Sequence, residues 1–190
     1  NLRRADAESA ESLNAWKPHR LQRIVQWVAA RRPAVLGVQE AFGSMVRDIT
    51  GAVELQQKAR CSTETGTQTL LQPVPLYAWV GEGRLGGEGD DAMGVGNERC
   101  AILFDTTQLA LDDGAEASGT RWLSPCPTTV ASIGWGAACP RVFTWARLRI
   151  RNFKHRGQGS QDQAPLLLVS NCHLDHCSVE ARQRGSEVIA

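Results

Sequence analysis

Apolar residues recur at helical spacing near the two ends of the chain, whereas the middle contains short, strand-like apolar runs. In the first helical segment, 14–30, the apolar positions follow steps of three and four residues: Trp16, Leu21, Ile24, Val25 and Val28. This spacing predicts a helix with one buried face that ends near Pro33.

Two further helices are predicted. The segment 44–53 places Met45, Ile49 and Val53 on one face. The last helix begins after Ser178, whose hydroxyl is a suitable N-cap.

Six segments predict strands: 34–40, 76–81, 99–105, 120–124, 141–150 and 166–171. The glycine-rich stretch 81–98 and the polar stretch 155–165 are predicted to be loops. The first of these lacks the Walker pattern and no helix follows it, which argues against a phosphate-binding P-loop. Helices at the start and strands in the middle, with no repeat, predict a layered α/β protein with antiparallel pairing.

The 190 residues fit one domain, with 42% hydrophobic and 22% charged residues. The net charge of +1 argues against binding a long polyanion by charge alone, and leaves room for a small phosphorylated substrate. No apolar run is long enough to cross a membrane, and the polar residues after Asn1 do not form a signal peptide. We therefore expect a soluble monomer, either cytoplasmic or secreted.

The six cysteines are scattered and form no C-x-x-C pair, so a zinc ribbon is poorly supported. Cys100 and Cys172 lie in strand-like patterns and are expected to be small buried apolar residues. The others are Cys61, Cys126, Cys139 and Cys177, which could form disulfides in an oxidising compartment.

The stretch "HLDH", 173–176, is the densest cluster of chemically active side chains. On a continuous strand, His173 and Asp175 share one face and His176 lies on the other. The two histidines therefore converge on one ligand only if the strand breaks between them. Asp175 is close enough to accept a ring N–H and fix a tautomer. The alternative is a structural histidine at a strand end.

Two carboxylates lie at the ends of predicted strands. Glu40 ends the strand 34–40, and Glu98 precedes the strand 99–105. Such a pair can hold one hard cation such as Mg²⁺, which prefers oxygen ligands. The simpler interpretation is a solvated strand end for Glu40 and an ordinary loop charge for Glu98.

Two families compete for the histidine cluster. "NCHLDH" resembles the H-x-H-x-D-H motif of metallo-β-lactamase-fold zinc hydrolases, except that Asn171 replaces the first histidine and removes a zinc ligand.

The second resemblance covers more of the chain. Six segments occur in order along the chain: "NLRR", "PAVLGVQEAF", "NERCAILFD", "WLSPCP", "GWGAACPRVFTWARL" and "NCHLDHCSVEAR". Together they resemble the endonuclease/exonuclease/phosphatase superfamily of metal-dependent phosphoesterases, with the closest likeness to its small hydrolase branch. The resemblance implies a layered sandwich of two mainly antiparallel sheets flanked by helices. It also implies a Mg²⁺- or Mn²⁺-dependent phosphodiesterase, phosphatase or nuclease.

The resemblance assigns roles to four residues. Glu40 matches the metal-binding glutamate, and Asn1 matches an asparagine at the metal and the phosphate. His173 matches the histidine that contacts the scissile phosphate. Glu98 matches an acidic residue that supports that catalytic histidine.

Three further residues have less direct matches. Arg141 is a candidate for phosphate contact. Asp175 and His176 match the end of the "HLDH" strand and are expected to support catalysis and substrate binding, respectively.

In this family a "G-D-x-N" segment and a later Asp-His pair supply the general base and further contacts, and the present sequence contains neither. We therefore expect the chain to be an N-terminal portion of one catalytic domain, with little hydrolytic activity alone. The longer protein is expected to be Mg²⁺-dependent. A catalytically inactive binding module of the same fold is a third possibility. The near-neutral charge favours a small phosphoester over long nucleic acid.

Overall fold

The structure is a computed structural model that describes residues 1–4, 9, 13–63, 77–87, 89, 91–92, 95–151 and 164–190. Its helical elements are η2 (Trp16–Arg20), α1 (Leu21–Arg31), α2 (Gly43–Thr63) and α3 (Val179–Ile189). Its strands are β1 (Val35–Ala41), β2 (Tyr77–Val80), β3 (Asp91–Ala92), β4 (Val95–Gly96), β5 (Arg99–Asp105), β6 (Leu109–Leu111), β7 (Ser118–Trp122), β8 (Val142–Ile150) and β9 (Leu166–Cys172).

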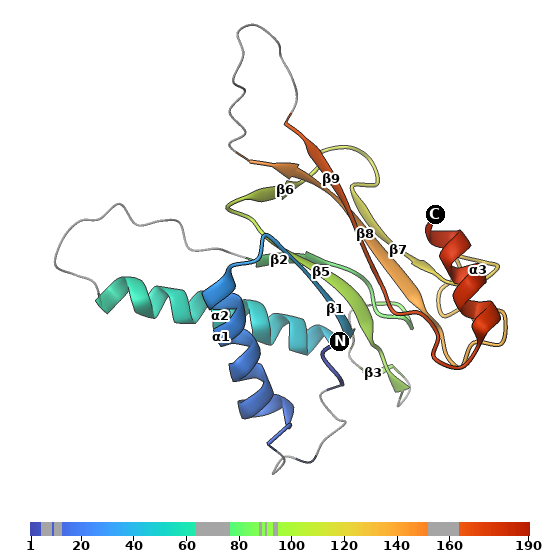
Figure 1. Cartoon of the computed structure of the whole chain (residues 1–190), viewed down its shortest axis with the longest axis horizontal. Coiled ribbons are helices and arrows are strands. Elements are labelled where there is room, and N and C mark those ends of the chain that lie inside the picture. Colours follow the sequence, from blue (N-terminus) through green and yellow to red (C-terminus); the bar gives the residue numbers. More distant parts are fainter. Residues whose placement is uncertain are drawn as a thin grey trace, which may run out of the picture.

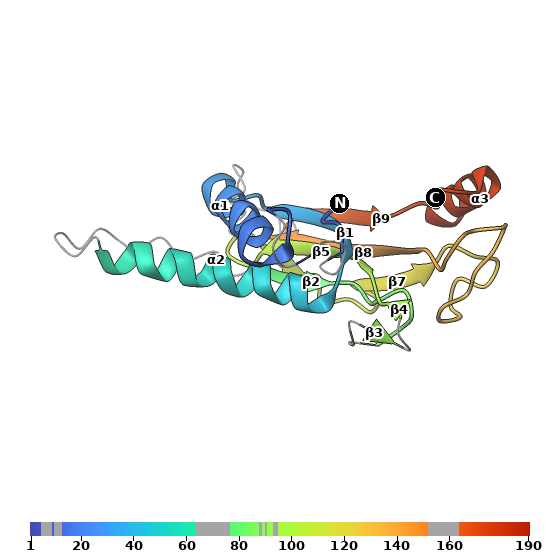
Figure 2. The same cartoon turned by 90° about the horizontal axis from the view of Figure 1, so that it is seen from below.

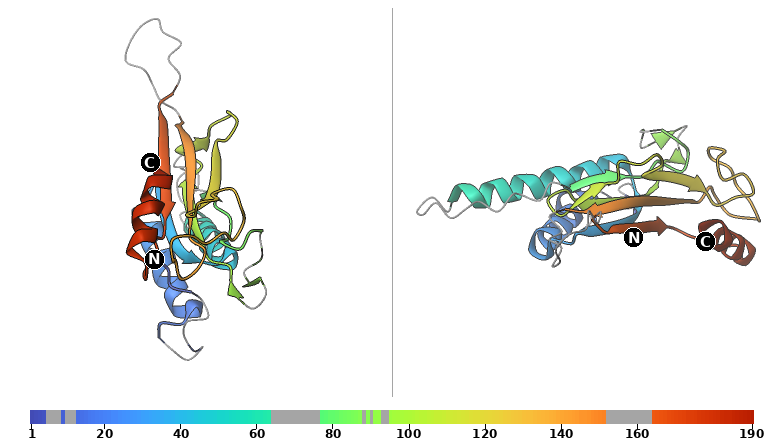
Figure 3. Two further views of the ribbon diagram at one scale, coloured as in Figure 1. Left: turned by 90° about the vertical axis from the view of Figure 1, so that its right-hand side faces the viewer. Right: turned by 90° about the horizontal axis from the view of Figure 1, so that it is seen from above.

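Two antiparallel sheets form the centre of the molecule. In the first, β5 lies between β1 and β2. In the second, β8 pairs with β9 along one edge and with β7 and β6 along the other. The sheets pack face to face, since β5 contacts both β8 and β9, and β1 contacts β9 (Figures 1 and 3).

The central strand β5 is buried along its whole length. Because side chains alternate across a strand, Ala101 and Leu103 face the helices, whereas Ile102 and Phe104 face the second sheet. β5 therefore contributes to two cores, one between sheet and helices and one between the two sheets.

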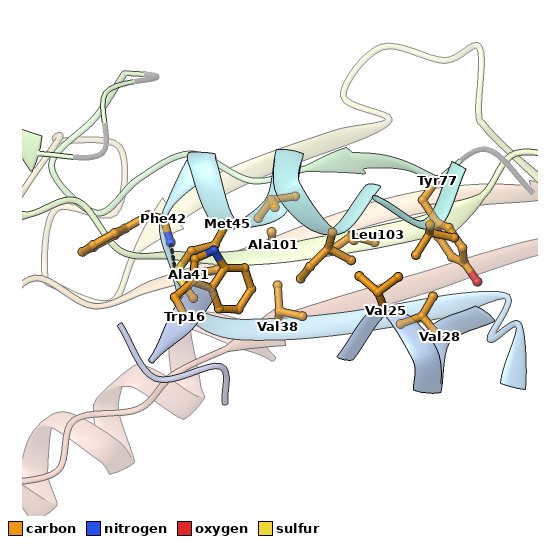
Figure 4. Packing of buried hydrophobic residues seen from close by; sticks show 13 residues of the cluster. Trp16, Val25, Val28, Val38, Ala41, Phe42, Met45, Tyr77, Ala101 and Leu103 are labelled. Atoms are coloured by element: carbon orange, nitrogen blue, oxygen red, sulfur yellow. Dashed lines mark hydrogen bonds between the residues drawn. The ribbon is translucent and has the colours of Figure 1, made fainter. Parts of the chain in front are cut away.

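The helices α1 and α2 pack together over the first sheet, and α3 lies at the opposite end of the molecule (Figures 1 and 2). Figure 4 shows the core between the first sheet and the helices α1 and α2, which includes Val25 and Met45 from the helices and Val38 and Leu103 from the sheet. The buried Met45, Ile49 and Val53 confirm the predicted apolar face of α2. That burial holds α2 in place over the sheet.

The ends of the helices follow local sequence. α1 stops at Arg32, which has a left-handed backbone (φ 45°) immediately before Pro33. α3 starts after Ser178, whose hydroxyl oxygen accepts the N–H of Ala181 at 3.1 Å, as predicted for an N-cap. α2 is ten residues longer than predicted at its C-terminal end.

The predicted α/β architecture of two mainly antiparallel sheets with helices is confirmed. The short strand β6 was not predicted, and the glycine-rich stretch 81–98 contains the small hairpin β3–β4. Most of the predicted loop 155–165 lies outside the described residues.

The described part of the chain also bears on the predictions for the cysteines and for membrane-spanning segments. Five cysteines there are free thiols, among them the buried Cys100 and the half-buried Cys172. Among the described residues, no helix is both long and apolar enough to cross a membrane.

Ile102 tests the packing between the sheets. It is fully buried, so Ile102→Ala should lower the free energy of unfolding by about 2–5 kcal/mol in urea denaturation. Leu168→Ala, at a side chain that is 74% exposed, is the matched control and should change it by less than about 0.5 kcal/mol. Equal effects would contradict the face-to-face arrangement.

Candidate active site

Glu40 lies in a β-bulge at the end of β1. Val38 pairs with Ala101, but the next pair joins Ala41 to Arg99, so β1 carries one extra residue at this point. Glu40 itself has a left-handed backbone, with φ of 55°. A bulge bends a strand and redirects a side chain, and bulges are frequent beside active sites.

The N-terminal residues lie against this bulge. The Leu2 N–H donates to the carbonyl oxygen of Gln39 at 2.8 Å. Asn1 Nδ2 donates to Glu40 Oε1 at 2.6 Å, and Asn1 Oδ1 accepts the N–H of Arg3 at 2.7 Å. Asn1 and Glu40 were assigned to the same site from the sequence, and the structure brings them into contact.

His173 faces Glu40 from the second sheet. Strand β9 ends at Cys172, and the next residue places its ring Nε2 3.9 Å from Glu40 Oε1. The ring Nδ1 lies 3.3 Å from Nη1 of Arg141. A guanidinium only donates hydrogen bonds, so Nδ1 must be the acceptor and the ring proton is on Nε2. The donor N–H of His173 therefore points towards the Glu40 carboxylate.

The electrostatic surroundings favour this neutral form of His173. Burial lowers the pKa of the imidazole, and the nearby charge of Arg141 lowers it further. The Glu40 carboxylate acts in the opposite direction but does not reverse the shift.

The guanidinium of Arg141 connects three members of the "HLDH" region. Besides its contact with His173, its Nη2 donates to Nδ1 of His176 at 2.8 Å, and its Nε donates to Asp175 Oδ2 at 3.3 Å. The sequence predicted that the two histidines would converge only if the strand broke between them. Strand β9 instead ends at Cys172, just before His173, so neither histidine is held in strand geometry and both reach one group. That group is an arginine. Arg141 is itself buried, which makes it a fixed part of the site.

Asp175 acts through Arg141. The sequence predicted that this carboxylate could accept a histidine ring N–H directly. That prediction is wrong for the described residues, where its partners are backbone N–H groups and Arg141. Its Oδ1 accepts the backbone N–H groups of Cys177 and Ser178, at 2.9 and 2.8 Å. Its Oδ2 accepts the N–H of Ala138 and Nε of Arg141. Asp175 thus ties together β9, α3 and the loop that precedes β8.

Asp175 is 2% exposed. Burial raises its pKa, but the hydrogen bonds from Ser178, Cys177, Ala138 and Arg141 outweigh burial and bring the pKa to about 2. The carboxylate is therefore ionised under all ordinary conditions.

Glu98 lines the same pocket as Glu40, Arg141 and His173, but its hydrogen-bond and ion-pair partners are arginines. Its Oε2 accepts from Arg84 Nη1 at 3.1 Å, and its Oε1 is 3.8 Å from Arg4. Burial raises the pKa of Glu98, and the Arg84 charge opposes that rise. The group in hydrogen-bonding contact with the His173 ring is Arg141, whereas the resemblance implied Glu98 for that supporting role.

A small pocket brings these groups together. It is lined by Glu40, Arg84, Glu98, Arg99, Cys100, Pro140, Arg141, Val142 and His173. Arg84 and Arg99 were not among the site residues predicted from the sequence. Arg99 begins the predicted strand 99–105, and a charged residue at the start of an otherwise apolar run was the available sequence signal. In the structure it is only 1% exposed, which is unusual for an arginine.

The donor atoms suit a hard cation better than zinc. No group of three or more His, Cys, Asp or Glu side chains that could hold a metal occurs in the part of the chain described. Structural zinc sites use four nitrogen or sulfur ligands, whereas Mg²⁺ is often held by one or two carboxylates with waters and substrate phosphate. Glu40, with the carboxamide of Asn1 beside it, fits the second pattern.

Asp175 provides a test of this network. Asp175→Asn should lower the free energy of unfolding at pH 7 by about 3–5 kcal/mol, because Arg141 keeps a buried charge without its partner. The folded-state pKa lies below the unfolded value of 3.8, so the contribution is present above pH 3.8 and is lost as pH falls towards about 2.

Urea unfolding of both proteins across this pH range measures the difference. The gap between them should narrow on acidification. Asp113→Asn, at an exposed turn, is the control and should change stability by less than about 0.5 kcal/mol. A gap that is independent of pH would contradict the assignment.

Comparison with known proteins gives matches among solved structures. No protein-family model matches the sequence, and a search of curated protein sequences gives no match. The endonuclease/exonuclease/phosphatase from Bacteroides vulgatus superposes with a TM-score of 0.70 at 24% identity, covering all of this chain and 56% of that one. A family protein from Bacteroides thetaiotaomicron also gives 0.70 at 24% identity, with 54% of its chain covered.

A third solved structure carries a more specific name. The mannosyl-6-phosphatase Bt3783 of Bacteroides thetaiotaomicron matches with a TM-score of 0.69 at 25% identity, again over all of this chain and 55% of its own. The resemblance inferred from the six sequence segments is thus confirmed at the level of the fold. The chain has the endonuclease/exonuclease/phosphatase fold and spans about half the length of the solved chains that it matches.

Proposed function

We propose that this chain binds a divalent cation through Glu40 and a phosphoester through His173, as part of a Mg²⁺-dependent phosphoester hydrolase. The observation that carries the proposal is the approach of His173 Nε2 to Glu40 Oε1, at 3.9 Å, from two different sheets. A carboxylate and an N–H donor that face one another across a pocket can bind a cation and an anion together.

Glu40 and Asn1 are the groups that would hold the cation. Mg²⁺ keeps several waters and takes its other ligands from one or two carboxylates and substrate phosphate, so few protein ligands suffice. Bound there, the cation would neutralise the non-bridging and leaving oxygens of the phosphoester. The hydrogen bond from Asn1 orients the Glu40 carboxylate at the end of its bulge.

His173 would donate Nε2–H to a phosphate oxygen. Arg141 makes this possible, because its Nη1 occupies the other ring nitrogen and leaves the proton on Nε2. A donor held in place before the reaction stabilises developing charge without reorganisation. Asp175 and His176 hold Arg141 in place, and their role is therefore to position Arg141, which contacts His173.

Three buried arginines line the pocket and make it suitable for an anion. Arg84, Arg99 and Arg141 line it together with the two glutamates. In its three contacts with side chains of the described residues, Arg141 uses one N–H of each nitrogen, so Nη1 and Nη2 each have a second N–H outside these contacts. We infer a small phosphoester as the substrate, in keeping with the near-neutral net charge of +1. The mannosyl-6-phosphatase name of one structural neighbour supports the same class.

We further propose that the 190 residues belong to a single catalytic domain and contribute binding groups to it. The expected base segment "G-D-x-N" does not occur in the sequence. The 190-residue chain alone is therefore expected to bind metal and phosphate but to hydrolyse phosphoesters slowly. Turnover of aryl phosphates by a longer form of the protein would separate the hydrolase from a catalytically inactive binding module.

The metal site is tested by Mn²⁺ titration followed by electron paramagnetic resonance. Glu40→Gln should weaken Mn²⁺ binding by about tenfold or more, since it removes the charged ligand. Glu180→Gln removes the same charge from an exposed position on α3 and should bind like wild type. Tightly held Zn²⁺ that survives Glu40→Gln would instead favour a zinc hydrolase.

The phosphate donor is tested by His173→Asn. Asparagine can still offer an acceptor near the Nδ1 position, but it lacks the Nε2–H. Phosphate affinity in the presence of Mn²⁺, measured by calorimetry, should fall by about tenfold, the equivalent of one hydrogen bond to a charged group. Mn²⁺ affinity without phosphate should be unchanged. A variant that binds phosphate as wild type does would remove His173 from the site.

A further inference from the structure

The side chain of Asn171 lies between the two sheets, beside both halves of the proposed site. It is 8% exposed and belongs to β9, two residues before His173. Its Nδ2 donates to the carbonyl oxygens of Val38 and Ala101, each at 2.9 Å. Its Oδ1 accepts from Gln39 Nε2 at 2.6 Å.

The chemistry of these partners fixes the orientation of the carboxamide. Both contacts of Nδ2 are with backbone carbonyl oxygens, which only accept hydrogen bonds. The amide NH₂ must therefore face β1 and β5, and both of its protons are used. A side chain held by three hydrogen bonds in a buried position has one orientation.

These bonds lie where β1 departs from regular pairing. Val38 and Ala101 are the last regular pair before the register shift, and Gln39 is the next residue along β1. Glu40 follows with its left-handed backbone. Asn171 thus contacts the strand on the two residues that immediately precede the metal-binding candidate, and sits on the strand that carries the phosphate donor.

We propose that Asn171 is a positioning residue, which holds the bulge of β1 against β9 and thereby sets the separation of Glu40 and His173. The relevance of this positioning to catalysis rests on the proposed function. The positioning itself can be measured without metal or substrate.

Gly37 gives a second way to move Asn171. A Cβ at Gly37 would lie 3.2 Å from Asn171 Cγ, tighter than most real contacts, so the carboxamide would have to shift. By contrast, a Cβ at Gly51 in α2 meets nothing within 4 Å. The same Gly→Ala change can therefore be made with and without pressure on Asn171.

The experiment uses two test variants and two controls. Asn171→Leu removes the carboxamide but keeps the branched arrangement of side-chain heavy atoms, and Gly37→Ala displaces it. Thr144→Val removes a fully buried hydroxyl from β8, at the residue paired with Asn171, and Gly51→Ala is the second control. All four proteins are compared by the backbone amide resonances of Glu40 and His173 without metal, and by Mn²⁺ affinity.

Both test variants should shift the Glu40 and His173 resonances and weaken Mn²⁺ binding, by about tenfold for Asn171→Leu, as for other outer-shell residues of metal sites. Both controls should match wild type at these resonances and in Mn²⁺ affinity. If Asn171→Leu does not fold, Gly37→Ala decides alone. Unchanged resonances in the test variants would overturn the inference. Absence of Glu40-dependent Mn²⁺ binding in wild type would instead overturn the proposed function, while the metal-free resonances would still decide the role of Asn171.

Discussion

The buried ion pair between Arg141 and Asp175 is the interaction on which the candidate site depends. Arg141 is 7% exposed and Asp175 2%, and each also contacts other groups. Asp175 accepts backbone N–H groups from the residues just before α3 and from the loop before β8, while Arg141 reaches both histidines. A buried pair of this kind adds little net stability over an apolar pair, but losing one partner is costly, so it specifies one arrangement of the loops around it.

That arrangement determines the chemical character of His173. A histidine next to a carboxylate commonly becomes a charged partner of it. Here the donor on its other nitrogen is Arg141, which holds the ring neutral and turns its N–H towards Glu40. The pocket therefore contains a carboxylate suited to a cation and a neutral N–H donor suited to an anion, and the two do not neutralise one another. This difference makes the pair suitable for a phosphate bound beside a metal ion.

Much of the fold could be predicted from periodicity. The apolar spacing of Met45, Ile49 and Val53 identified α2, and Ser178 marked the start of α3, because these signals are local. Order along the chain also placed Glu40 and His173 at strand ends. The register shift that gives Glu40 a positive φ could not be predicted, since it depends on how β1 pairs with a strand about sixty residues away. The role of Arg141 between Asp175 and two histidines was missed for the same reason.

In the proposed function, Glu40 and His173 together bind a metal ion and a phosphate. Anomalous diffraction from crystals soaked with Mn²⁺ and inorganic phosphate tests it directly. We expect a manganese peak within coordination distance of the Glu40 carboxylate, with a phosphate oxygen in hydrogen-bonding contact with His173 Nε2. Manganese bound elsewhere in these crystals, with the Glu40 and His173 side chains still facing one another and no phosphate between them, would contradict it.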